Sequence, residues 1–254
     1  MQLNIKSQKN YITNARQSLN LLPNTLAHLY FIKDKRKKRE RKTMTSKKVK
    51  KHYPRPPISL IESNIPGWGV DIYIGGSTGV ADAELLEKHN IKVVLNCAVN
   101  LDIDLVNLQD PTPPAHLLKH GWAPVRYYKI GLIDGPGNPE SMVLAGYHLM
   151  RSALDQELPE KASYKVREKG NILVNCRGGR SRSVTIVALF LHLEYPDRYP
   201  TLDAAIAHIR KTRELHPDEW FETPKPALIH LAERAASMEK ILRDAGFGQD
   251  MKKK

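Results

Sequence analysis

The strongest chemical signal in the sequence is a cysteine followed by a short loop rich in glycine and arginine. Residues 171–183 read Asn-Ile-Leu-Val-Asn-Cys-Arg-Gly-Gly-Arg-Ser-Arg-Ser. The apolar part predicts a short buried strand, and the serine and arginine residues at the end predict the start of a helix. A loop wound tightly between a strand and a helix points several backbone N–H groups inward, and such a nest binds anions. The residues predicted to bind phosphate are Arg177, Gly178, Gly179, Arg180, Ser181 and Arg182.

Cys176 stands directly before this loop and is the predicted nucleophile. Helix N-termini and nearby arginines lower the pKa of a cysteine from about 8.5 toward about 4–7, which favours the thiolate. A thiolate at the bottom of a phosphate cradle is aimed at phosphorus. Arg182 offers a planar fork of donors that suits two phosphate oxygens. Ser183 stands where its hydroxyl can steady the sulfur as a leaving group in a second step.

The Cys-x5-Arg-Ser pattern resembles the signature of the protein tyrosine phosphatase superfamily, and Arg177 with Ser181-Arg182-Ser183 resembles its dual-specificity branch. The resemblance continues outside the loop and covers about residues 66–240, with the segments Ile-Tyr-Ile-Gly-Gly, Val-Leu-Asn-Cys-Ala and Tyr-Tyr-Lys-Ile in the family's order. It implies an α/β fold of the cysteine-phosphatase type and hydrolysis of phosphomonoesters through a phosphocysteine intermediate. It implies no cofactor.

The same family uses an aspartate on a separate loop as the general acid that protonates the leaving oxygen. Asp134 matches this position because it directly follows the predicted strand at 125–132, within the turn Asp-Gly-Pro-Gly. Its separation from Cys176 is longer than the family's usual spacing, and a polar insertion at 157–170 accounts for the excess. Glu140 is the fallback.

Two further positions bear on the predicted site. The family has a histidine before the nucleophile, whereas this chain has Asn175, which brings hydrogen-bond donors but no charge. We therefore expect a weaker lowering of the Cys176 pKa and slower turnover. Cys97 ends a predicted strand, and the resemblance implies that this strand neighbours the one with the nucleophile. Cys97 is either a buried apolar residue or, as in some members, a redox partner of Cys176.

The arrangement of predicted elements alternates between strands and helices, which is typical of a mostly parallel sheet flanked by helices. Apolar runs predict strands at 71–75, 91–98, 125–132 and 171–174. Helical spacing predicts helices at 81–90, from 139 onwards, at 184–195, at 201–216 and at 226–245. The helix at 184–195 is apolar nearly all round, so we expect it to be buried.

The net charge of +13 is concentrated at the two ends of the chain. Residues 1–65 are predicted to be a basic, disordered extension and linker, 66–246 the catalytic domain, and 247–254 a basic tail. The basic stretch 33–51 attracts nucleic acid or acidic membranes, or is a solvated tail without a specific partner. Residues 1–43 are a transit peptide, an ordinary extension, or a segment that is not translated because Met44 begins the protein.

The small number of cysteines favours a reducing compartment, so a cytoplasmic location is predicted, and a nuclear one if the basic run acts as a localisation signal. No apolar run approaches the length of a membrane span. His116 and His120 are four residues apart but have no third ligand nearby, so no metal site is predicted. Nothing in the sequence indicates an oligomer.

Three functions remain open at this stage. The first is a phosphatase for phosphotyrosine, and for phosphoserine and phosphothreonine, in proteins. The second is a phosphatase for a polyanion such as a phosphoinositide, an inositol phosphate or an RNA 5′-triphosphate, suggested by Arg177 and Arg180 in the loop. The third is a phosphate-binding module with little catalysis, suggested by Asn175.

Overall fold

The computed structural model describes residues 51, 53–106, 116–118 and 120–248. The chain from Tyr53 onwards forms one compact unit. Its centre is a five-stranded sheet in the order β1-β2-β5-β3-β4. Only β1 is antiparallel to its neighbour, and the other strands run parallel. The strands are β1 (Ile58–Glu62), β2 (Ile72–Gly75), β3 (Ile91–Ala98), β4 (Arg126–Leu132) and β5 (Asn171–Asn175).

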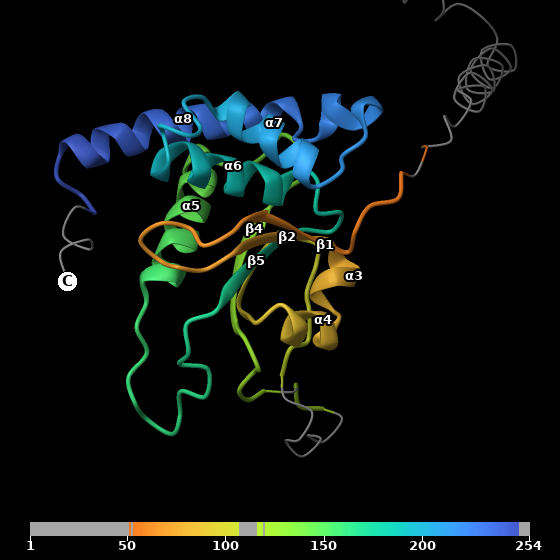
Figure 1. The fold of residues 1–254 in the computed structure, drawn as a ribbon, viewed down its shortest axis with the longest axis vertical. Coiled ribbons are helices and arrows are strands. Elements are labelled where there is room, and N and C mark those ends of the chain that lie inside the picture. Colours follow the sequence, from red (N-terminus) through yellow and green to blue (C-terminus); the bar gives the residue numbers. More distant parts are fainter. Residues whose placement is uncertain (1–50, 52, 107–115, 119, 249–254) are drawn as a thin grey trace, which may run out of the picture. The chain divides into compact units, whose positions relative to one another are not determined.

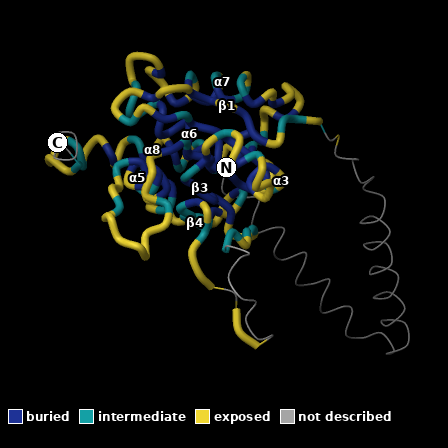
Figure 2. The backbone as a smooth tube through the Cα atoms, turned by 60° about the horizontal axis from the view of Figure 1, so that its bottom comes forward, coloured by how far each residue is buried: buried dark blue, intermediate teal, exposed yellow. Residues whose placement is uncertain are grey.

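Helices cover both faces of this sheet (Figure 1). One face carries α5 (Glu140–Asp155) and α6 (Arg182–Glu194). The elements that follow α6 lie on the same side: α7 (Leu202–Thr212), the 3-10 helix η1 (Pro217–Glu222) and α8 (Pro226–Asp244). The other face carries the short helices α3 (Ser77–Val80) and α4 (Ala83–Lys88). Figure 2 shows the buried residues along the strands and the inward sides of the helices.

Local sequence explains where the main helices begin and how deeply they are buried. Thr201 caps α7 by accepting a hydrogen bond from the backbone N–H of Ala204 at 3.1 Å. Pro226 begins α8, where its missing N–H has no cost. The first ten residues of α6, from Arg182 to Leu191, are all buried. An apolar helix of this kind has to lie between two other layers, which fixes the start of α6 in the interior.

The predicted α/β class, with a mostly parallel sheet flanked by helices, is confirmed. The sheet begins earlier than predicted, because residues 58–62 were assigned to the linker before residue 66 but form the edge strand β1. Pro54, Pro56 and Pro57 suggested a linker, and this run of prolines obscured the short strand that follows it. The insertion at 157–170 contains no helix or strand.

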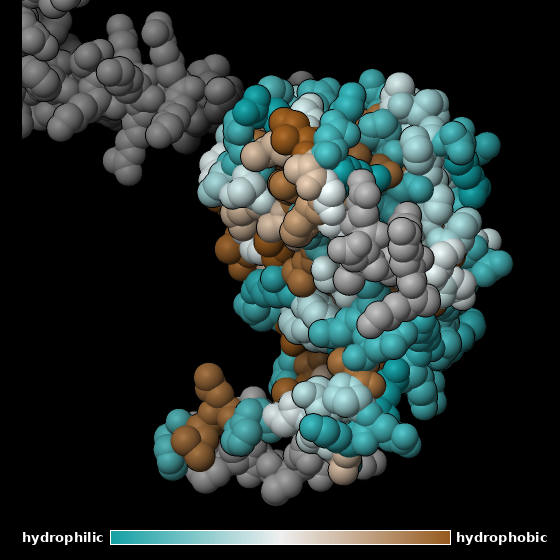
Figure 3. Space-filling view, turned by 90° about the vertical axis from the view of Figure 1, so that its left-hand side faces the viewer, coloured by the Kyte–Doolittle hydropathy of each residue, from teal (hydrophilic) through white to brown (hydrophobic). Residues whose placement is uncertain are grey.

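Hydrophobic side chains also reach the surface at several loops and helix ends. The face in Figure 3 is mostly hydrophilic, with hydrophobic side chains gathered in a few places. The most exposed large hydrophobic residue among the described ones is Leu118, and Phe221 and Ile241 follow. No described helix is both long enough and apolar enough to cross a bilayer.

Candidate active site

The predicted site residues lie at the carboxyl edge of the parallel strands. Strand β5 ends at Asn175 and leads directly into Cys176 and the loop that opens α6. In register beside it are Gly75 of β2 and Asn96 of β3. Because the carboxyl ends of parallel strands meet at one edge, the loops after β3, β4 and β5 converge there.

The side chains of Cys176 and Ser183 face each other in the interior. Cys176 Sγ lies 3.3 Å from Ser183 Oγ, and both residues are buried. Burial alone raises the pKa of the Cys176 thiol, since it disfavours the charged form. Hydrogen bonds from the Ser183 hydroxyl, from the backbone N–H groups of Ser183 and Arg180, and the charge of Arg182 outweigh it and lower the pKa below its ordinary value. The surroundings of Cys176 therefore favour its thiolate form more than those of an ordinary cysteine do.

The loop itself is shaped by one glycine. Gly179 has a φ of +61°, and a Cβ at this position would lie 2.5 Å from the carbonyl oxygen of Gly75. A side chain there would force the loop away from β2, so only glycine fits. Gly178 has no such constraint, because its Cβ would meet only the Arg180 side chain at 3.5 Å. Of the two glycines predicted to bind phosphate, only Gly179 has a positive φ.

The amides of this loop are available to a ligand. Within the described part of the chain, no backbone N–H of residues 177–181 bonds to a backbone carbonyl. These amides stand at the N-terminus of α6, where the helix dipole favours negative charge. The loop therefore has the donors and the field of an anion site.

Arg182 is held at the same place with part of its donor set free. One of its terminal nitrogens, Nη1, donates to Asn100 Oδ1 at 2.9 Å and to the carbonyl oxygen of Leu132 at 3.4 Å. Its Nε is buried and has no hydrogen-bond partner among the described residues. A buried donor of a guanidinium without an acceptor is costly, and a phosphate oxygen would satisfy it.

The two other arginines of the loop differ from the sequence-based expectation. Both were predicted to bind phosphate through the cradle. The side chain of Arg180 instead pairs with Glu219 at 2.5 Å and with Glu222 at 3.1 Å, both in η1. Only its backbone N–H faces the sulfur of Cys176. Arg177 is exposed, so its side chain is accessible at the rim of the site.

Arg213 supports the loop from below, and sequence reasoning missed it. It is buried at the end of α7, and its Nε donates to the carbonyl oxygen of Gly179 at 3.2 Å. Its other nitrogens donate to Ser59 Oγ at 2.9 Å and to the carbonyl oxygens of Pro56 and Pro57. Burial lowers its pKa to about 10. Its only sequence signal is an arginine near the end of the amphipathic helix predicted at 201–216, and such a residue is ordinarily solvated.

Asp134 lies in the loop after β4. Hydrogen bonds between the Asn138 side chain and the backbone hold this loop in shape. The Asn138 side chain accepts from the N–H of Ile133 at 2.8 Å and donates to the carbonyl oxygens of Ile133 and Gly135 at 3.0 Å. Asp134 Oδ2 lies 4.0 Å from Lys225 Nζ, and its buried Oδ1 has no hydrogen-bond partner among the described residues.

Lys225 joins this loop to the cysteine loop. Its backbone N–H donates to Ser181 Oγ at 3.3 Å, while its ammonium group lies near the Asp134 carboxylate. The predicted general acid and the predicted cradle are thus bridged by one residue that the sequence did not single out. Glu140, the fallback acid, forms a surface ion pair with Arg234 at 2.6 Å.

Asn175 does not make the hydrogen bonds that the sequence led us to expect. It is fully buried, and neither its Nδ2 nor its Oδ1 has a partner among the described residues. Because side chains alternate along a strand, Asn175 shares the face of Leu173, which packs with the cluster beneath α3 and α4. Its amide is therefore directed away from the face that carries Cys176.

Cys97 lies on the strand beside the nucleophile, as the resemblance implied. The register pairs Asn96 of β3 with Asn175 of β5, which brings Cys97 level with Cys176. Both cysteines belong to the same buried cluster, and both are free thiols. Burial raises the pKa of Cys97 well above its ordinary value, and the negative charge of Cys176 adds to this. Its redox role stays a prediction.

No protein-family model matches the sequence. Solved structures with a similar fold include human DUSP28, at 19% identity and a TM-score of 0.46, covering 74% of this chain and 97% of that one. The Yvh1 phosphatase domain from Chaetomium thermophilum has 19% identity and a TM-score of 0.47, covering 72% and 97%. The human tyrosine phosphatase-like serine/threonine/tyrosine-interacting protein has 16% identity and a TM-score of 0.45, covering 72% and 97%.

Identities and scores of this size concern the fold alone. They assign neither an activity nor a substrate to this chain, so the functional argument rests on the residues of the site. Among the described residues no group of three potential ligands could hold a metal ion. The His120 ring contacts the carbonyl oxygen of Leu118 at 3.2 Å.

Proposed function

We propose that this chain is a cysteine-dependent phosphatase of the dual-specificity type, which hydrolyses phosphomonoesters through a phosphocysteine intermediate. The observation that carries the proposal is the placement of a buried thiol with a lowered pKa at the N-terminus of a helix, 3.3 Å from the Ser183 hydroxyl. The Arg182 side chain supports it, because its unpaired Nε lies in the first turn of α6, next to the loop amides, where a phosphate oxygen would satisfy it.

The residues account for both steps of the reaction. In the first, the Cys176 thiolate attacks phosphorus, the sulfur–phosphorus bond forms, and the ester bond breaks. Asp134 gives its proton to the leaving oxygen. In the second, water attacks phosphorus, Asp134 takes a proton from that water, and the electron pair of the breaking bond returns to sulfur. The Ser183 hydroxyl then donates a hydrogen bond to the released thiolate, and inorganic phosphate leaves.

The proposed substrates are phosphoproteins carrying phosphotyrosine, and also phosphoserine and phosphothreonine. The polyanion alternative depended on several arginines around the cradle. Since Arg180 pairs with Glu219 and Glu222, this alternative loses one of the two loop arginines that suggested it and keeps the exposed Arg177. Residues 33–50 of the basic stretch lie outside the described residues.

The decisive experiment is hydrolysis of para-nitrophenyl phosphate in EDTA by the full chain. We expect activity in the wild type, background activity in Cys176→Ser, and a loss of about 10²–10⁴-fold in kcat for Asp134→Asn. An inactive wild type that still binds vanadate would contradict the proposal and favour a phosphate-binding module. Comparing phosphopeptides, phosphoinositides and triphosphate-ended RNA, with and without residues 1–51, then tests the substrate class.

A further inference from the structure

The segment before the first strand reaches the catalytic loop through two separate sets of contacts. Residues 53–57 were expected to be part of a linker, yet they pack on the elements that support the cysteine loop. The first set runs through the backbone: the carbonyl oxygens of Pro56 and Pro57 accept from Arg213, which also donates to Gly179. The second set runs through side chains.

The centre of the side-chain set is Glu219, a buried carboxylate in η1. Arg55 Nη2 lies 3.1 Å from each of its two oxygens. Arg180 Nη1 lies 2.5 Å from Oε1 of the same carboxylate. The exposed fraction of the Glu219 side chain is 7% and that of Arg55 is 14%. An ion pair in such a setting is screened little by solvent, and removing one partner leaves the other poorly compensated.

The far end of this chain of contacts is the nucleophile. The backbone N–H of Arg180 is one of the donors to the sulfur of Cys176. The direction of that N–H depends on the backbone around residue 180, which the Arg180–Glu219 pair holds from the side-chain end. Fixing Glu219 with Arg55 therefore fixes one of the amides that surround the thiolate and any bound phosphate.

We propose that Arg55 is a positioning residue for the catalytic loop, acting through Glu219 and Arg180 on the amide that faces Cys176. Tyr53 holds the same segment in place, because its ring stacks on His216 with centroids 3.8 Å apart and its hydroxyl bonds to Asp218. The catalytic unit thus begins functionally at about residue 53. This inference rests on the proposed function for its effect on turnover, but its effect on the thiol does not require turnover.

The test measures the rate of Cys176 alkylation by iodoacetamide across pH in the full chain, followed by mass spectrometry. The variants are Arg55→Ala, Arg55→Lys and Glu219→Gln. We expect Arg55→Ala to move the alkylation profile to higher pH and to lower kcat/KM for para-nitrophenyl phosphate about threefold to tenfold. Arg55→Lys restores much of both, since it keeps the charge.

The matched control is Arg234→Ala, which removes an arginine–glutamate pair with Glu140 at 2.6 Å on the exposed surface. It should leave the alkylation profile unchanged. The double variant Arg55→Ala/Glu219→Gln should be no worse than the poorer single variant, because both act through one contact. The groups whose charge acts on Cys176 are Arg182, Arg213 and Cys97, and none of them is altered.

An alkylation profile of Arg55→Ala identical to that of the wild type would overturn the inference, as would effects that add fully in the double variant. If the wild type hydrolyses no phosphoester but Arg55→Ala still shifts the thiol profile, the proposed function fails and the inference stands. If the wild type is active and the thiol profile does not move, only the inference fails. Thermal unfolding of each variant separates a loop effect from loss of the fold.

Discussion

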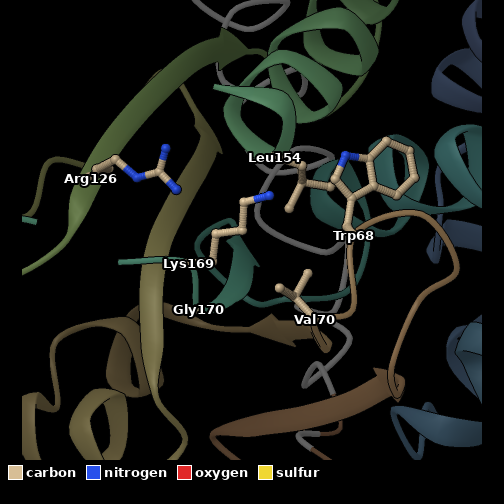
Figure 4. A pocket seen from close by; sticks show the side chains of 6 residues that line it. All are labelled: Trp68, Val70, Arg126, Leu154, Lys169 and Gly170. Atoms are coloured by element: carbon tan, nitrogen blue, oxygen red, sulfur yellow. The ribbon is translucent and has the colours of Figure 1, made fainter. Parts of the chain in front are cut away.

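Arg126 and Arg182 lie at opposite edges of the sheet, and their surroundings give the two side chains different roles. Arg126 begins β4 at the amino edge and lines a small pocket with Trp68 and Lys169 (Figure 4). Arg182 lies at the carboxyl edge, in the first turn of α6. In both side chains Nε is buried without a partner among the described residues.

The two arginines differ in the helix end that each one faces. Arg126 donates to the carbonyl oxygens of Ala153 and Gln156, at 3.2 and 3.3 Å, which terminate α5. Its charge compensates the negative end of that helix. Arg182 adds a positive charge to the positive end of α6, so the balance there is left to an anion. The charge of Arg126 is thus balanced by a helix end, whereas that of Arg182 is not.

The largest expected effect that tests this comparison is on turnover. Arg182→Ala should lower kcat/KM for para-nitrophenyl phosphate by about 10²–10³-fold, since it removes a donor aimed at the transferring group. Arg126→Ala should leave kcat/KM within about twofold and lower the free energy of unfolding by about 1 kcal/mol. Steady-state kinetics and urea unfolding measure the two. A similar loss of turnover in both variants would refute the distinction.

A smaller effect is expected from the donor that steadies the sulfur. Ser183→Ala removes the side-chain hydrogen bond that lowers the pKa of Cys176, so the pKa should rise. The thiolate fraction at a pH below that pKa then falls, and the rate of iodoacetamide alkylation falls with it. The alkylation profile should move to higher pH in Ser183→Ala and stay in place in Ser237→Ala, a surface serine on α8. An unmoved profile in Ser183→Ala would remove the hydroxyl from the mechanism.

The variant Asn175→His tests whether a further positive group at the carboxyl edge lowers the pKa of Cys176 and raises turnover. We expect a lower pKa of Cys176 and a turnover number a few-fold higher, because a positive charge acts on the thiolate through the weakly screening interior even from the opposite face of the sheet. Pre-steady-state kinetics together with thiol titration measure both. A variant that folds but shows a raised thiol pKa would mean that the buried position cannot hold a charged imidazole.

The smallest effect on the reduced enzyme concerns the second thiol at the same edge. Cys97 is buried like Cys176 but receives no help from a helix N-terminus, and its pKa is raised whereas that of Cys176 is lowered. Cys97→Ala should therefore leave the reduced activity nearly unchanged. Mild peroxide should produce a Cys97–Cys176 disulfide in the wild type, seen by mass spectrometry. Oxidation of Cys176 without this bond would leave Cys97 a packing residue.

The core of the catalytic loop was predictable because its geometry is local. A buried strand, a cysteine, a glycine that tolerates positive φ and the start of a helix follow one another within residues 171–183. Strand β3 was predictable from its continuous apolar run, and α5 and the other long helices were predictable from the spacing of their apolar residues. The segment 58–62 was missed because the prolines that precede it suggested a linker and because its pairing partner, β2, is needed to recognise it.

From the sequence by itself we predicted the chemistry of the site, with Cys176 as nucleophile and Arg182 as the phosphate-binding arginine, and the mostly parallel sheet, which the structure confirms. Tertiary structure alone decided how that chemistry is supported. Only the fold turns Arg180 away toward Glu219, directs the Asn175 amide into the opposite face, and brings Arg213, Lys225 and Arg55 to the site. These contacts join positions far apart in the chain, and burial and charge pairing select them after the elements have packed.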